Sequence, residues 1–291
     1  MRRITHTQKE ITLKKLAAFE SLIRRIGTPV EQGNVSAGAI KTAYLAAGNG
    51  QPVVLLHGSS AGGITWYGVI GPLSHHWRVI APDVVGYGGS DKPSAAYDRP
   101  YFAAWLRAFL DAFDLPKVSL IGLSQGGAIA LQFTLENPER VDRLVLADSA
   151  GLGKEASLGG FLGLLCGNTF PSKVAGWWFN RYLVHYPRSI DAAWAEYKRE
   201  VSRMPGGKRP FWQGRGKAVA PVPVEQLRQV THRTLIIWGE EERFLPLSQA
   251  EAAQRVMPNA QLRVIPQAGH ITFFDQPEAF CDLVIRFLKE P

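Results

Sequence analysis

One serine of the sequence lies where a strand, a tight turn and a helix are expected to meet. Ser124 is the centre of the motif Gly-Leu-Ser-Gln-Gly at 122–126, which follows an apolar run at 118–121 and precedes a helix-like segment at 128–136. Glycines two residues to either side of Ser124 permit a sharp turn with a strained serine backbone, which lifts the hydroxyl clear of the sheet. Because this short pattern also arises by chance, the rest of the sequence must supply the groups that would make the serine reactive.

A serine hydroxyl is a poor nucleophile near neutral pH, so it needs a base, an acid that orients the base, and N–H donors for the oxyanion. His270 follows the strand-like segment 262–265 and is a candidate base. The loop 240–243, directly after another strand-like segment, holds three carboxylates, so the chain order is serine, acid, histidine. The loop His-Gly-Ser-Ser at 57–60 follows a third apolar run, and its glycine permits a turn that points an N–H at the site. The backbone N–H groups of Ser59 and Gln125 are the expected oxyanion donors.

Together these motifs resemble those of the α/β-hydrolase family, and the likeness extends from about residue 30 to residue 288. In the family's order they are His-Gly at 57–58, Asp-Val-Val-Gly-Tyr-Gly-Gly-Ser-Asp-Lys-Pro at 83–93, the serine turn at 122–126, Trp-Gly at 238–239 with Arg-Phe-Leu-Pro at 243–246, and Ala-Gly-His at 268–270. The resemblance implies a nucleophilic Ser124 and a basic His270.

The acid departs from the family pattern. After Trp-Gly the family normally carries aspartate, where this chain has Glu242. Glutamate can orient a histidine equally well, but its extra methylene demands a shifted backbone or another rotamer. Asp148, at the end of the strand-like segment 144–147, is the alternative acid, because some family members take their acid from that strand. Motif position favours Glu242.

The order of elements predicts an α/β fold with a mostly parallel sheet covered by helices on both faces. We expect strands near 29–33, 39–46, 53–56, 78–81, 118–121, 143–147, 234–237 and 261–265, and helices near 98–113, 125–136, 247–256 and 277–289. The long, aromatic-rich interval after the sixth strand is too apolar for a solvated linker and predicts a helical cap at 150–228. The core would then comprise 29–149 and 229–291.

Residues 1–28 form a further unit, in which apolar residues recur at near-helical spacing between 8 and 26. We expect an amphipathic helix that docks on the core or on a second copy of the chain, which leaves a homodimer open. Attachment to a membrane surface is a lesser alternative.

Charge and composition exclude several classes of protein. The net charge of +8 is concentrated in residues 1–28 (+5) and 198–217 (+6), and no aromatic-basic motif accompanies it, so nucleic-acid binding is not indicated. Apolar stretches are too short for stable membrane insertion, and no signal peptide is indicated, so we expect a cytoplasmic protein. No clustering of Cys or His suggests a metal.

The resemblance implies a serine hydrolase that needs no cofactor and acts on a small molecule, for which a carboxylic ester or lactone is our first hypothesis. The alternative is the carbon–carbon hydrolases of ring-cleavage products, whose serine turn and acid loop are also similar. Those enzymes usually carry Asn before the serine and Trp after the histidine, whereas this chain has Leu123 and Ile271. A ligand receptor on a hydrolase scaffold is a third reading, which the complete set of reactive residues argues against.

Overall fold

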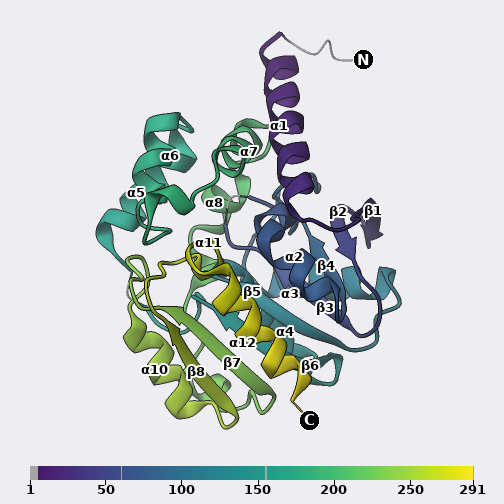
Figure 1. Cartoon of the computed structure of the whole chain (residues 1–291), viewed down its shortest axis with the longest axis vertical. Coiled ribbons are helices and arrows are strands. Elements are labelled where there is room, and N and C mark those ends of the chain that lie inside the picture. Colours follow the sequence, from purple (N-terminus) through teal and green to yellow (C-terminus); the bar gives the residue numbers. More distant parts are fainter. Residues whose placement is uncertain (1–5, 60, 155, 291) are drawn as a thin grey trace.

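An eight-stranded sheet in the order β1-β2-β4-β3-β5-β6-β7-β8 forms the centre of the molecule (Figure 1). The computed structural model describes residues 6–59, 61–154 and 156–290, with side chains from residue 14 onward. The side chain of Ile11, in the apolar pattern expected between residues 8 and 26, and Ser60 of the 57–60 loop therefore lie outside the described set. Only β2 runs antiparallel to its neighbours, β1 and β4. The strands are β1 (Glu31–Ala37), β2 (Ile40–Ala47), β3 (Pro52–Leu56), β4 (Arg78–Pro82), β5 (Val118–Leu123), β6 (Val141–Ala147), β7 (Arg233–Gly239) and β8 (Ala260–Ile265).

Helices cover both faces of this sheet. On one face lie α3 (Arg99–Ala112), α4 (Gln125–Glu136) and α10 (Leu247–Val256), and on the other lie α2 (Tyr67–Ser74) and α12 (Pro277–Lys289). The central strands β3 and β5 are buried almost throughout, as expected for parallel strands packed between two helical layers. The predicted α/β fold, with a mostly parallel sheet and helices on both sides, is therefore confirmed.

A group of helices follows β6 and lies at one end of the sheet. It comprises α5 (Leu158–Thr169), α6 (Lys173–Asn180), α7 (Ala192–Arg203), α8 (Arg209–Gly214) and α9 (Val224–Leu227). Short 3-10 turns η1 (Gly63–Trp66), η2 (Pro138–Arg140), η3 (Pro187–Ser189) and η4 (Lys217–Val219) and the single turn α11 (Thr272–Asp275) complete the described elements. The helices α5 to α9 and their connections are called the cap below. The cap lies over the carboxyl ends of the parallel strands, where open α/β sheets bind their ligands.

The N-terminal helix α1 (His6–Arg25) packs against the cap helix α7 and the core helix α2 of the same chain. Leu22 and Ile26 are buried, Phe19 lies with its ring centroid 5.6 Å from that of Tyr197, and Arg25 forms an ion pair with Asp191. The apolar side of α1 thus joins core and cap. Within the described residues, no helix is long and apolar enough to cross a membrane.

Two details differ from the sequence-based expectation. The expected first strand is 29–33, whereas β1 spans Glu31–Ala37. The reason is a hairpin turn at Gly38, with φ of +60°, because the turn pairs Ala37 with Ile40 and the pairing with β2 continues until Glu31 lies opposite Ala46. The helix α2 was not predicted, since it contains Pro72 and two glycines and has little amphipathic pattern.

Candidate active site

The serine turn between β5 and α4 has the strained geometry that its glycines suggest. Ser124 has φ 52° and ψ −116°, a conformation unusual for a residue with a side chain, and it directly precedes α4. A Cβ on Gly122 would lie 2.5 Å from the Gly126 carbonyl oxygen, and one on Gly126 would collide with the Leu56 carbonyl. Larger residues at either glycine would therefore force this turn apart.

His270 and Glu242 meet on the loops after β8 and β7. His270 Nδ1 donates a short hydrogen bond to Glu242 Oε2, and both side chains are almost fully buried. The other carboxylate oxygen, Oε1, accepts from the Phe244 backbone N–H at 2.5 Å, which fixes the glutamate within its own loop. Since Nδ1 is engaged, Nε2 is the ring nitrogen available to accept a proton from Ser124.

Asp148 lies close to Glu242 but makes a different contact. Its Oδ1 accepts from the Gly239 backbone N–H at 2.9 Å, and its side chain is fully buried. Burial, and next the charge on Glu242, raise the pKa of Asp148 well above its ordinary value. Of the two candidate acids, Glu242 is hydrogen-bonded to His270, whereas Asp148 is hydrogen-bonded to the backbone at the end of β7.

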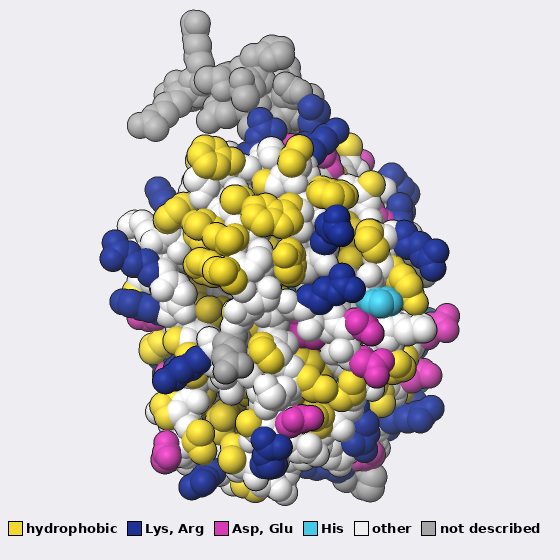
Figure 2. All heavy atoms as spheres, turned by 90° about the vertical axis from the view of Figure 1, so that its left-hand side faces the viewer, with side chains coloured by type: hydrophobic (Ala, Val, Ile, Leu, Met, Phe, Trp, Pro, Cys, Tyr) yellow, Lys and Arg dark blue, Asp and Glu magenta, His cyan; other side chains and the backbone are white. Residues whose placement is uncertain are grey.

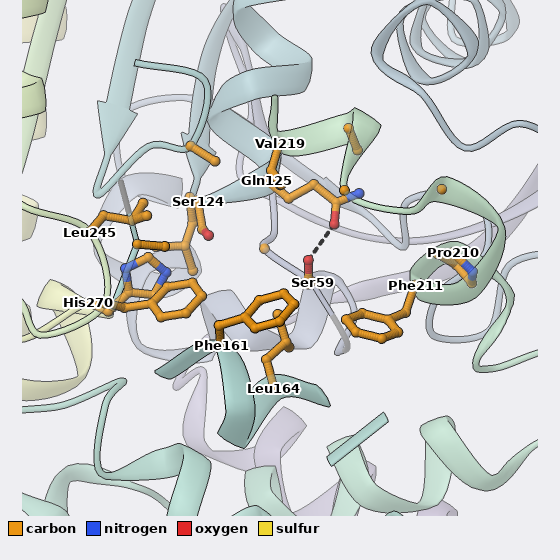
Figure 3. A pocket seen from close by; sticks show the side chains of 18 of the residues that line it. Ser59, Ser124, Gln125, Phe161, Leu164, Pro210, Phe211, Val219, Leu245 and His270 are labelled. Carbon is orange, nitrogen blue, oxygen red and sulfur yellow. Dashed lines mark hydrogen bonds between the residues drawn. The ribbon is translucent and has the colours of Figure 1, made fainter. Parts of the chain in front are cut away.

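The loop after β3 lies against the serine turn. A Cβ on Gly58 would lie 3.3 Å from Ser124 Cβ, and the Ser59 hydroxyl donates to Gln125 Oε1 (Figure 3). The Tyr87 hydroxyl donates to the same Gln125 oxygen at 2.9 Å, so Gln125 is held from two sides. As the first residue of α4, Gln125 has a backbone N–H without an intrahelical partner, which suits it to bind an oxyanion.

His57 has a structural place in this loop. Its Nδ1–H donates to the Gly58 carbonyl at 2.6 Å, and its Nε2 accepts from the Val84 N–H at 2.9 Å. A carbonyl can only accept and an N–H can only donate, so these partners fix a neutral ring, and burial lowers the pKa of His57 accordingly.

Ser124, His270, Ser59 and Gln125 all line one cavity of about 560 Å³ between the sheet and the cap (Figure 3). Most of its wall is apolar, and Lys154 and Arg215 are the cationic side chains on it. Leu123 and Ile271, the neighbours of Ser124 and His270 in sequence, also lie on this wall. The cap contributes apolar side chains from α5, α6 and α8, among them Phe161, Leu164, Leu165, Phe179, Phe211 and Trp212.

Sequence reasoning missed Asp275, which connects the histidine loop to the cap. Its carboxylate accepts from the backbone N–H groups of Gly269 (2.9 Å), His185 (2.7 Å) and Tyr186 (3.0 Å). No local motif marks this role, because two of the three partners lie about ninety residues away in the sequence. Tyr87 was part of the 83–93 motif, but its contact with Gln125 was not foreseen. In the part of the chain that the structure describes, no three His, Cys, Asp or Glu side chains group to hold a metal ion.

Comparison with known proteins gives a consistent family assignment. Residues 51–277 match the model of a family described as the alpha/beta hydrolase fold. A 2-hydroxy-6-oxo-2,4-heptadienoate hydrolase from Pseudomonas putida is 33% identical over 87% of this chain and 95% of the relative. A meta-cleavage product hydrolase from Pseudomonas fluorescens superposes with a TM-score of 0.79 at 29% identity, covering 88% of this chain and 97% of that one. A naproxen esterase from Bacillus subtilis superposes with a TM-score of 0.88 at 23% identity, over 99% and 100% of the two chains, which shows a shared fold. From the family match and these relatives, we conclude that the chain belongs to the alpha/beta hydrolase fold family.

Proposed function

We propose that this hydrolase cleaves uncharged, lipophilic carboxylic esters, lactones included, through an acyl-enzyme intermediate on Ser124. The observation that carries the proposal is that the strained Ser124 and His270 line the same apolar cavity, with His270 hydrogen-bonded to Glu242 behind it. This is the arrangement that activates a serine for acyl transfer.

In the proposed reaction, Ser124 Oγ attacks the ester carbonyl while His270 Nε2 takes the hydroxyl proton. Glu242 stabilises the imidazolium, and the N–H groups of Ser59 and Gln125 bind the oxyanion. As the oxyanion collapses, the bond to the alcohol breaks and His270 returns the proton to the leaving oxygen. Water, deprotonated by His270, then attacks the acyl-enzyme and releases the acid.

The wall next to the reacting atoms supports an ester over a carbon–carbon bond. A dienoate substrate carries a carboxylate and an enol, which need polar partners beside the serine and histidine. Here those two positions hold the apolar Leu123 and Ile271, and the partners that the wall offers a carboxylate are Lys154 and Arg215 instead. A neutral ester makes no such demand and fits the apolar wall.

Carbon–carbon cleavage of ring-cleavage products is the second candidate function. It is favoured by sequence similarity, since the heptadienoate hydrolase is 33% identical along nearly its whole length. Both reactions would use the same serine and histidine, so substrate specificity and not the catalytic residues separates the two candidates.

The test is a substrate panel of p-nitrophenyl esters of graded chain length, lactones and a dienol ring-cleavage product. We expect turnover of the esters, a preference for apolar acyl groups, and a loss of roughly 10³-fold or more in kcat for Ser124→Ala. Ser248→Ala, at an exposed position of α10, is the matched control and should keep full activity.

The same panel separates the alternatives. Turnover of the dienol alone would establish the second candidate and overturn the first. A protein that binds ligands of the panel without turning any of them over would be a receptor on a hydrolase scaffold, and ester turnover that survives Ser124→Ala would remove the serine from the mechanism.

A further inference from the structure

The cap exposes a continuous apolar surface that the core does not cover. Of the twelve large apolar side chains that are exposed in the described residues, seven fall between residues 158 and 178, on α5, α6 and their connection. Val174 is 76% exposed, Phe170 73% and Trp177 60%. Figure 2 shows apolar side chains gathered over this part of the molecule with Lys and Arg around them. The face used below, called the cap apolar face, comprises Leu158, Phe161, Phe170, Val174, Trp177 and Trp178.

This exposure needs an explanation, because contiguous apolar surface in contact with water is unfavourable and promotes association. The exposed apolar residues Leu16, Val224 and Val264 each belong to a different element, away from α5 and α6. The cap apolar face is therefore a local feature of two consecutive helices.

The segment 156–190 that carries this face has charge of one sign, and Glu196 of α7, which lines a cavity of the cap together with Trp177, is paired with Arg199. From residue 156 to residue 190 the sequence contains no Asp or Glu, and its charged residues are Lys173, Arg181 and Arg188. The Arg181 guanidinium lies over the Trp177 ring, 5.0 Å from its centroid, so a cation sits at the edge of the exposed aromatic group. Tryptophan beside arginine or lysine is the composition of protein surfaces that contact lipid headgroups.

The absence of carboxylates argues against a second copy of the chain as the occupant. In a twofold dimer through this face, each cation would approach its own symmetry mate or another cation, and the segment offers no acidic side chain to balance them. An anionic bilayer supplies both the apolar layer and the negative headgroups.

The cap apolar face also reaches the catalytic cavity. Phe161 is 48% exposed and at the same time lines the cavity, as do the exposed Trp212 and Val219. A lipophilic molecule leaving a bilayer at this face would thus meet apolar side chains along its path to Ser124.

We propose that the cap apolar face docks on the surface of anionic lipid bilayers, so that lipophilic substrate enters the cavity from the membrane. Docking itself is independent of catalysis, whereas the entry of ester substrate rests on the proposed function. Docking on a surface requires no helix that spans the membrane.

The first experiment measures co-sedimentation with vesicles of phosphatidylglycerol or of phosphatidylcholine, using the wild type and the inactive Ser124→Ala. Both proteins should bind the anionic vesicles at least about tenfold more tightly than the neutral ones, and added salt should weaken that binding. Failure to bind either vesicle, or equal binding to both, would overturn the proposal.

Substitutions then locate the surface. Val174→Asp with Trp177→Asp, both at exposed positions of α6, should reduce binding by about tenfold or more without loss of thermal stability. Val224→Asp with Val264→Asp, on α9 and β8, is the matched control, because it adds the same two charges at exposed apolar positions away from this face. Undiminished binding of the double variant would move the contact to another surface. A wild type that is dimeric without lipid, while the double variant is monomeric, would assign the face to self-association instead.

A kinetic arm connects docking to catalysis. The double variant should lose rate on a long-chain ester embedded in phosphatidylglycerol vesicles but keep its kcat/KM for a short, water-soluble ester. Vesicle binding without any ester turnover would leave docking intact and refute the proposed function, so the two ideas fail separately. Equal losses on both substrates would contradict entry from the membrane.

Discussion

Two carboxyl groups near the histidine differ in what their surroundings let them do. Glu242 accepts from His270 Nδ1 and from the Phe244 N–H, so both of its oxygens have a hydrogen-bond donor. Asp148 is fully buried and faces the charge of Glu242, which raises the pKa of Asp148. A buried site disfavours two neighbouring negative charges, and Asp148 is the carboxyl group whose pKa rises there.

Substitution of the two acids tests this division. Glu242→Gln should lower kcat by about 10²- to 10⁴-fold, because the amide favours the wrong histidine tautomer, while Glu242→Asp should recover part of that loss. Asp148→Asn should be mild, since the amide oxygen can still accept from the Gly239 N–H. Steady-state kinetics on an activated ester provide the measurement. If Asp148→Asn abolished activity while Glu242→Gln had almost no effect, the residue that orients His270 would be Asp148.

At the scale of elements, the cap is attached to the histidine loop by backbone contacts. Asp275, on the turn α11, gathers three N–H groups from the histidine loop and from residues 185–186, and Ile271 N–H donates to the Leu183 carbonyl at 2.8 Å. A Cβ on Gly269 would lie 2.7 Å from the backbone of Val184, so the two segments approach as closely as a glycine permits. The position of His270 is therefore coupled to the position of the cap.

Asp275→Ala should weaken this attachment, because three N–H groups lose their acceptor in a partly buried place. We expect a loss of about 1–3 kcal/mol in the free energy of unfolding and a fall in kcat/KM that exceeds the effect of the matched control Asp282→Ala, on the exposed side of α12. Denaturant unfolding and ester kinetics measure the two effects. If the kinetics of Asp275→Ala were unchanged, the position of His270 would not depend on this attachment of the cap.

At the scale of the whole molecule, the packing of the cap helices α6 and α7 encloses an unusual charge. Lys198 of α7 is 7% exposed; its ammonium donates to Asn180 at 2.7 Å and lies 4.6 Å and 5.1 Å from the ring centroids of Trp194 and Phe179. Burial lowers the pKa of Lys198 to about 7. It lines a second cavity of about 400 Å³ within the cap.

The lowered pKa makes global stability depend on pH with a defined sign. Below about pH 7 Lys198 is protonated in the folded and in the unfolded state, and the full cost of burying its charge lowers stability. Between pH 7 and the ordinary pKa of lysine, the unfolded state binds more protons than the folded state, so the contribution of Lys198 to stability rises with pH. Lys198→Met should therefore stabilise the protein relative to the wild type by more at pH 6 than at pH 10, with a difference of at least about 1 kcal/mol. Thermal unfolding at both pH values, with the exposed Lys173→Met as control, checks this. An effect of Lys198→Met that is the same at both pH values would contradict it.

The sequence by itself determined the fold class and the order of the central elements, because buried parallel strands are apolar runs and the serine turn, α4, α10 and α12 are specified by residues adjacent in the chain. It also narrowed the reactive residues to a few loops, since those loops follow strands whose carboxyl ends share one edge of the sheet. Their catalytic roles remain predictions.

The tertiary structure alone decided the contacts between residues that lie far apart in the sequence. Glu242 and Asp148 end neighbouring strands, and only the packing of β6 against β7 shows which carboxylate contacts His270. The contacts of α1 with its own cap, the attachment by Asp275 and the burial of Lys198 join residues that are 166, 90 and 18 positions apart, and no local pattern encodes such contacts. The physical reason is that side-chain type is written in the sequence, whereas solvent exposure and hydrogen-bond partners arise only when distant segments pack together.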